Sequence, residues 1–205
     1  MKKQKYIDDI KDIKDIMNRS TKFISLSGMS GIVTGTIALI ASYLAYNTVY
    51  LGQNYLEDRI TIITGNKLLI LGSLALATIT LCLLTGLYFT SKKAKENNQT
   101  LWNNQAKRFY MSLALPLIAG GILCVILLLK GYIGLVAPLT LIFYGLSLIN
   151  GSQYSISEIR GLGIIQVILG LISTYFIGYG LIFWAIGFGI MHIIYGIMMH
   201  LKYGS

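Results

Sequence analysis

Charged side chains are missing from the six longest apolar stretches of this sequence, none of which contains Asp, Glu, Lys or Arg. Only 12% of the 205 residues are charged, whereas 55% are hydrophobic. This composition excludes a disordered chain and an ordinary soluble domain, and it indicates an integral membrane protein. The lack of acidic residues within the stretches also disfavours a proton- or ion-coupled carrier, since such carriers usually hold acidic side chains in their spans.

Cysteine is equally scarce, because Cys82 and Cys124 are the two in the chain. Both fall within apolar stretches, and at 1.5 Å of helix rise per residue their depths differ by roughly 10 Å. A disulfide needs Cα atoms closer than about 7 Å, so we expect none and interpret both side chains as packing residues. No metal site and no cofactor site is predicted.

The apolar stretches have the length of membrane-spanning helices, because about 20 such residues cross a bilayer core about 30 Å thick. Strands are disfavoured, since barrel strands alternate apolar and polar residues and these stretches do not. The expected fold is therefore an all-α integral membrane six-helix bundle. The fourth and fifth spans are short, so they must tilt little, be extended by their flanks or lie in a thinned bilayer. The predicted spans are 23–46, 68–90, 109–129, 135–149, 162–177 and 181–199.

Basic residues are distributed unevenly between the segments that flank the spans. With a cytoplasmic N-terminus, the N-terminal segment, the second and fourth loops and the C-terminus carry fourteen Lys and Arg, and the opposite side carries three. The positive-inside rule therefore predicts that both termini are cytoplasmic, in a multi-pass protein of the cell (inner) membrane. The net charge of +9 then belongs to one membrane face, which would attract anionic lipids and needs no nucleic-acid partner.

Segment 1–22 is predicted to form a cytoplasmic amphipathic helix, separate from the bundle of residues 23–205. Ile7, Ile10 and Met17 recur at helical spacing, and charged residues fill the other faces. One interpretation is an interfacial helix that lies on the membrane. The other is a docking helix for a cytoplasmic partner or a second copy of the chain, and the four aspartates of the segment weaken a purely lipid-binding role.

Polar residues are sparse within the spans and gather in the last three. If 162–177 and 181–199 form an antiparallel hairpin about Tyr179, Gln166 and His192 lie thirteen residues from Tyr179 on either side. The two side chains then have equal depth in the membrane, so we expect them to lie close together.

This polar group has a structural and a functional interpretation. In the structural one, Gln166 and His192 join two helices by a hydrogen bond. In the functional one, they line a ligand-binding pocket that opens to the cytoplasm, because intramembrane ionisable residues are functional candidates by default. The other predicted members of this pocket are Tyr144, Ser173 (facing Ala185), and Glu158 and Arg160 at the cytoplasmic mouth.

Small residues at helical spacing predict close contacts between helices, since they let two backbones approach. The predicted packing positions are Gly31, Gly35, Gly170, Gly189 and Gly196. A stripe of large side chains on the last span is interpreted as packing, with a groove for a cofactor or a hydrophobic ligand as the alternative. It comprises Trp184, Phe188, Met191, Tyr195 and Met198.

The first span carries Gly28-Met29-Ser30-Gly31, which resembles the GxSG nucleophile motif of rhomboid intramembrane proteases. That resemblance implies a six-span serine hydrolase in which Ser30 is the nucleophile and His192 the base. Three features depart from the family pattern. The motif lies on the first span instead of the fourth, the sequence has no histidine-to-asparagine oxyanion motif, and the site would open toward the cytoplasm.

Three longer segments carry a second resemblance. Together, SLSGMSG, FYGLSLINGSQYSISEIRGLG and FWAIGFGIMHIIYG are similar to an uncharacterised family of small bacterial multispan membrane proteins. The resemblance implies a bacterial membrane protein and carries no activity with it.

Three classes of function remain. The first is a non-enzymatic scaffold, sensor or accessory subunit, which acts through its small-residue seams and its cytoplasmic arm, as a homo-oligomer or with a membrane or cytoplasmic protein partner. The alternative is a facilitative transporter or channel for a neutral or lipidic solute, which would use the polar pocket. The remote alternative is an intramembrane serine hydrolase, since a catalyst needs a base with an oriented partner near a nucleophile.

Overall fold

The computed structural model describes residues 27–50, 65–96 and 104–203 of the chain. Within these ranges all regular structure is helical and no strand occurs, so the predicted all-α class is confirmed. Among the described residues, six helices are long and apolar enough to cross a membrane. The predicted amphipathic helix of segment 1–22 lies outside the described residues.

The helices follow the predicted order, with different ends. The first three are α2 (Gly28–Tyr50), α3 (Gly65–Glu96) and α4 (Asn104–Leu129). The next two are α5 (Val136–Gly151), flanked by the 3₁₀ turns η1 (Ile133–Leu135) and η2 (Ser152–Tyr154), and α6 (Glu158–Tyr175). The last helix consists of α7 (Gly180–Trp184), the π-helical segment η3 (Ala185–Met191) and α8 (His192–Tyr203).

Flanking residues lengthen the two short predicted spans. The fourth apolar helical stretch runs over Ile133–Tyr154, because the two 3₁₀ turns extend α5 at both ends. The fifth begins at Glu158, four residues before the predicted start, and ends at Tyr175. The chain then turns at Gly178, whose φ of 102° favours glycine because a Cβ is strained in that region. The hairpin between the last two long helices is therefore fixed by a glycine.

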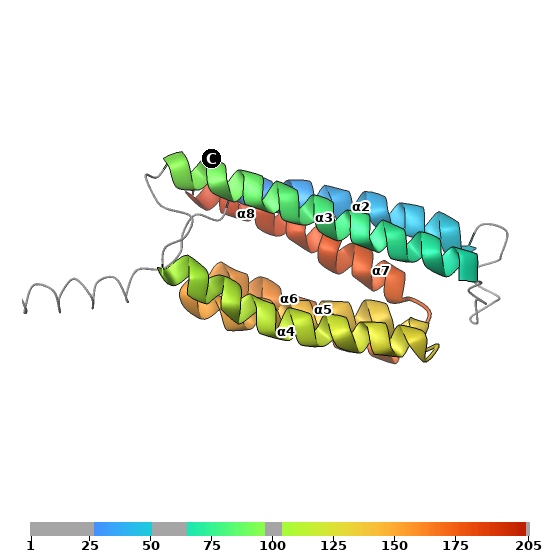
Figure 1. Ribbon diagram of the computed structural model, residues 1–205. Coiled ribbons are helices and arrows are strands. Elements are labelled where there is room, and N and C mark those ends of the chain that lie inside the picture. Colours follow the sequence, from blue (N-terminus) through green and yellow to red (C-terminus); the bar gives the residue numbers. More distant parts are fainter. Residues whose placement is uncertain (1–26, 51–64, 97–103, 204–205) are drawn as a thin grey trace, which may run out of the picture.

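The helices form two layers (Figure 1). We call α2, α3 and α8 the first layer, in which α2 packs on both α3 and α8, and α4, α5 and α6 the second layer, in which α5 packs on both α4 and α6. The last helix joins the layers, since its α7 and η3 segments contact α2 as well as α5 and α6. Any side chain that couples the layers near their middle is therefore best sought on this helix.

Glycines permit the closest approach within each layer. A Cβ on Gly196 of α8 would lie 2.6 Å from the backbone nitrogen of Ile32 on α2, and one on Gly35 would lie 2.7 Å from the carbonyl oxygen of Gly189. In the second layer, a Cβ on Gly145 of α5 would lie 2.6 Å from the carbonyl oxygen of Gly163 on α6. Backbones in contact at these distances leave no room for a methyl group, which is the small-residue packing expected between membrane helices.

The five predicted packing glycines all lie at such contacts, although they do not share one seam. Gly31, Gly35, Gly189 and Gly196 lie between α2 and the last helix, whereas Gly170 of α6 lies against Ile142 and the Pro138 carbonyl of α5. The predicted packing glycines of the last two long helices therefore face different partners, α2 for Gly189 and Gly196 and α5 for Gly170.

Basic side chains collect at one end of the bundle, which we call the basic end. It comprises the ends of α3 and α8 and the beginnings of α4 and α6. Its described Lys and Arg residues are Lys92, Lys93, Lys95, Lys107, Arg108, Arg160 and Lys202. The opposite end has Lys67 and Lys130 among the described residues, and Lys67 Nζ donates to the Val49 carbonyl over 3.2 Å. The two ends of the described bundle therefore differ strongly in charge.

Candidate functional site: a polar network between the two layers

Gln166 and His192 converge on one backbone carbonyl group. The amide nitrogen Nε2 of Gln166, on α6, donates to the Gly187 carbonyl oxygen over 2.7 Å. The ring nitrogen Nδ1 of His192, on α8, lies 3.0 Å from the same oxygen. The Gln166 side chain is 0% exposed and that of His192 is 7% exposed. The structure thus places the two residues together through a shared acceptor on the last helix.

The carbonyl fixes the protonation of the neutral imidazole. A carbonyl oxygen can only accept, so Nδ1 of His192 carries the hydrogen and Nε2 is left as an acceptor. The Tyr144 hydroxyl lies 2.8 Å from Nε2 and therefore donates its proton to it. The resulting chain runs from Tyr144 on α5, through His192 and the Gly187 carbonyl, to Gln166 on α6. It connects the second layer with the last helix at two points, through Tyr144 of α5 and Gln166 of α6.

The backbone at Gly187 is shaped for this arrangement. Segment Ala185–Met191 is π-helical, and in a π-helix the carbonyl of residue i faces residue i+5 instead of i+4. His192 is the fifth residue after Gly187, so its ring can fold back on that carbonyl. A Cβ at position 187 would lie 2.5 Å from both Gln166 Oε1 and Leu141 Cδ2, so any larger residue here would have to displace these two side chains.

Aromatic rings surround the histidine. Phe188 stacks on His192 with ring centroids 5.8 Å apart, and Tyr144 lies 5.0 Å from Phe188 by the same measure. Trp184 follows at 4.9 Å from Phe188. Two members of the predicted stripe of large side chains, Phe188 and Trp184, thus pack beside the polar network, which shields its hydrogen bonds in an apolar setting where they are strong.

Ser173 lies two turns from Gln166 on α6 and is not joined to the network by a described contact. Its side chain is 0% exposed, and its hydroxyl oxygen has no hydrogen-bond partner among the described residues. Gln166 Oε1 is in the same position, because the described residues provide no donor for it. The second layer therefore holds two buried polar atoms whose partners are unassigned.

Glu158 and Arg160 lie at the basic end, away from the network. Glu158 forms an ion pair with Lys202 across α6 and α8, and the Ser157 hydroxyl donates to its second carboxylate oxygen over 3.2 Å. Lys202 is ten residues, or about 15 Å of helix, beyond His192. Arg160 is exposed. Glu158 therefore belongs to an ionic contact between the layers at the basic end.

The Ser30 hydroxyl is directed to its own helix. It donates to the Ser27 carbonyl over 2.6 Å, at the start of α2. Both ring nitrogens of His192 are occupied by Tyr144 and Gly187. Among the described residues, Ser30 and His192 therefore form no nucleophile–base pair in this arrangement.

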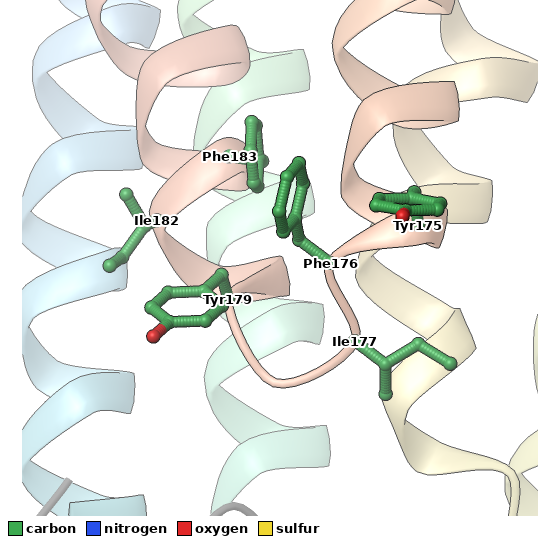
Figure 2. Close-up of a pocket in the computed structure, with 6 residues that line it drawn as sticks. All are labelled: Tyr175, Phe176, Ile177, Tyr179, Ile182 and Phe183. Carbon is green, nitrogen blue, oxygen red and sulfur yellow. The ribbon is translucent and has the colours of Figure 1, made fainter. Parts of the chain in front are cut away.

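An open depression of about 640 Å³ lies at the α6–α7 turn, at the end of the bundle opposite the basic end (Figure 2). Its lining is aromatic and aliphatic, and Phe176 stacks on Phe183 across it with ring centroids 6.4 Å apart. None of the residues predicted to form the polar pocket lines it. The six lining residues are Tyr175, Phe176, Ile177, Tyr179, Ile182 and Phe183.

Gly187 is the one network member that sequence reasoning missed. It contributes a backbone carbonyl, and periodic patterns of side chains carry no information about such a group. An isolated glycine two residues before Gly189 was the available signal, but it is equally typical of a packing position. Comparison of the chain with protein families, with curated proteins and with solved structures gives no match.

Proposed function

We propose that this protein is a non-enzymatic multi-pass membrane protein that acts as a scaffold, sensor or accessory subunit. The observation that carries the proposal is the hydrogen-bonded network around Gly187. Tyr144 and His192 direct their hydrogen bonds to each other and to that carbonyl, as does the Gln166 amide nitrogen. Side chains that hold two layers of helices together in this way serve assembly, whereas a catalyst needs a base with a free nitrogen near a nucleophile.

Helix length supports insertion of the bundle in a membrane. On α4, Arg108 and Lys130 flank an uninterrupted apolar stretch from Phe109 to Leu129. At 1.5 Å per residue this stretch is roughly 32 Å long, close to the hydrocarbon thickness of a bilayer. The charges that flank it would then lie in the two head-group regions.

The charge difference between the two ends supports a cytoplasmic basic end, with both termini on that side of the cell (inner) membrane. Lys92, Lys107, Arg108 and Arg160 are exposed there and would meet the head groups of anionic lipids. The contribution of each such residue is about 1 kcal/mol near an anionic surface and falls with rising salt.

The proposal also includes a protein partner, either a second copy of the chain or another protein. Its test is the mass of the full chain in detergent and in lipid nanodiscs, measured by native mass spectrometry, together with cross-linking in intact cells. A homo-oligomer or a reproducible stoichiometric partner is expected. A strictly monomeric protein that cross-links to nothing would remove the main support for a scaffold.

A facilitator for a neutral or lipidic solute is the second candidate, and one observation favours it. Gln166 Oε1 and Ser173 Oγ are buried without a described partner, and they would accept hydrogen bonds from a solute between the layers. The variant His192→Ala separates the candidates. A scaffold loses only stability, whereas loss of solute flux in proteoliposomes by a variant that remains folded would favour transport.

A further inference from the structure

The last helix presents opposite faces to the two layers within a few residues. Gly187 lies against Gln166 and Leu141 of the second layer, whereas Gly189 lies against Leu39 and the Gly35 carbonyl of the first. Residues two apart are about 200° apart around an α-helix, so Gly187 and Gly189 can face opposite layers in an α-helix as well as in a π-helix. The last helix thus packs against both layers.

The contact between the His192 side chain and the Gly187 carbonyl, in contrast, could not form in an α-helix. In an α-helix, residues 187 and 192 would be about 140° apart, and a side chain at 192 would point away from the carbonyl at 187. The wider turns of the π-helical segment remove this offset, and His192 Nδ1 lies 3.0 Å from the Gly187 oxygen. The contact between His192 and the Gly187 carbonyl therefore depends on the π-helical form of the backbone.

We propose that segment Ala185–Met191 is a register switch, held in its π-helical form by the hydrogen bond between Tyr144 and His192. Loss of that bond lets the segment return to an α-helix. A π turn contains one residue more than an α turn, so this return rotates α7 by about 100° relative to α8. Since α8 stays in its glycine seam with α2, the rotation is transmitted through α7 to α5 and α6.

The rotation is large enough to measure. A group on the helix surface, about 5 Å from the axis, moves by about 8 Å when the helix turns by 100°. Nitroxide labels at Ile182→Cys on α7 and Leu69→Cys on α3 report it by pulsed electron spin resonance, in a chain that also carries Cys82→Ser and Cys124→Ser. Ile182 is 43% exposed and Leu69 is 74% exposed, so both sites accept a label.

The variants Tyr144→Phe and Gly187→Ala each disturb the network that is proposed to hold the π-helical form. The first removes the hydroxyl donor, and the second places a methyl group against Gln166 Oε1. We expect a single label distance for the full-length parent in nanodiscs and a second distance, shifted by several ångströms, in each variant. Tyr132→Phe removes a 60% exposed phenol and serves as the control, with the parent's distance unchanged.

Either variant is sufficient if the other fails to fold, as judged by size-exclusion chromatography. A single unchanged distance in a folded Tyr144→Phe or Gly187→Ala variant would overturn the proposal, because the π-helical form would then be independent of the network. A second distance in Tyr132→Phe as well would also overturn it, since the change would not be specific to the network.

Discussion

Tyr144 and His192 are 48 residues apart in the chain, yet the hydroxyl of one donates to Nε2 of the other over 2.8 Å. The contact joins the middle of α5 to the first residue of α8, and so it couples the two layers of the bundle. Because Nδ1 is fixed by the Gly187 carbonyl, Nε2 has no second hydrogen to offer, and the tyrosine is its natural donor.

The variant Tyr144→Phe should therefore destabilise the protein modestly. A hydrogen bond between membrane helices contributes on average about 0.6 kcal/mol and at most about 1.7 kcal/mol, so a loss in that range is expected. Unfolding in mixed micelles by a denaturing detergent measures it. Tyr132→Phe, on an exposed tyrosine, is the matched control.

A double-mutant cycle shows whether the loss belongs to this bond. Tyr144→Phe and His192→Ala remove the two partners of the same contact, so their combined effect should be smaller than the sum of the single effects. Strict additivity would contradict the coupling, and the stabilisation by Tyr144 would then have to come from the packing of its ring alone.

In the glycine seam between α2 and the last helix, replacing a glycine by alanine should affect stability far more than the same substitution elsewhere. Gly196→Ala should destabilise the bundle by about 1–3 kcal/mol, because the methyl group would lie 2.6 Å from the Ile32 nitrogen and backbone cannot yield easily. The same micelle unfolding measurement applies.

The control for the seam is Gly72→Ala on α3, where a Cβ meets nothing within 4 Å. Alanine favours a helix over glycine by up to about 1 kcal/mol, so this variant should be neutral or more stable. If the two alanine variants behaved alike, close contact at Gly196 would not be what holds α2 to α8.

Helix number, helix class and the depth of the polar residues follow from the sequence because they depend on local composition and on counting from a turn. Gln166 and His192 are equidistant from Tyr179, and an antiparallel hairpin necessarily brings such positions to the same depth. The pairing of helices does not follow in this way. A glycine stripe predicts that a helix packs closely on another helix, but it does not show which one. In the structure, Gly189 faces α2 and Gly170 faces α5.

The backbone at Gly187 shows the second limit. The π-helical turns of Ala185–Met191 accompany contacts of Gly187 and His192 with Gln166 and Tyr144, which are distant in the sequence, and no local pattern shows such contacts. The partner of Glu158 shows a third limit. Glu158 pairs with Lys202, for which α8 had to continue past the predicted end of the last span.

The ion pair between Glu158 and Lys202 should contribute little to stability. Lys202 is 58% exposed at the basic end, and exposed ion pairs typically contribute less than about 1 kcal/mol. We expect Glu158→Gln to lower the unfolding free energy slightly in dilute buffer and not at all at 1 M salt, where screening acts within about 3 Å. Arg160→Gln is the control, because it also removes one charge at the basic end but does not touch the ion pair. If this variant lost as much unfolding free energy as Glu158→Gln or more, overall charge would matter more than the pair.

The orientation of the bundle is open to a direct chemical test. Lys130→Cys at the end opposite the basic end and Lys92→Cys at the basic end both replace exposed side chains in a chain with Cys82→Ser and Cys124→Ser. A cytoplasmic basic end predicts that a membrane-impermeant maleimide labels position 130 in intact cells and position 92 only after permeabilisation, because a charged reagent does not cross the bilayer. The reverse pattern would invert the topology. Labelling at both positions in intact cells would show instead that the basic end is not confined to one side, and the lipid contacts proposed for Lys107, Arg108 and Arg160 would lose their basis.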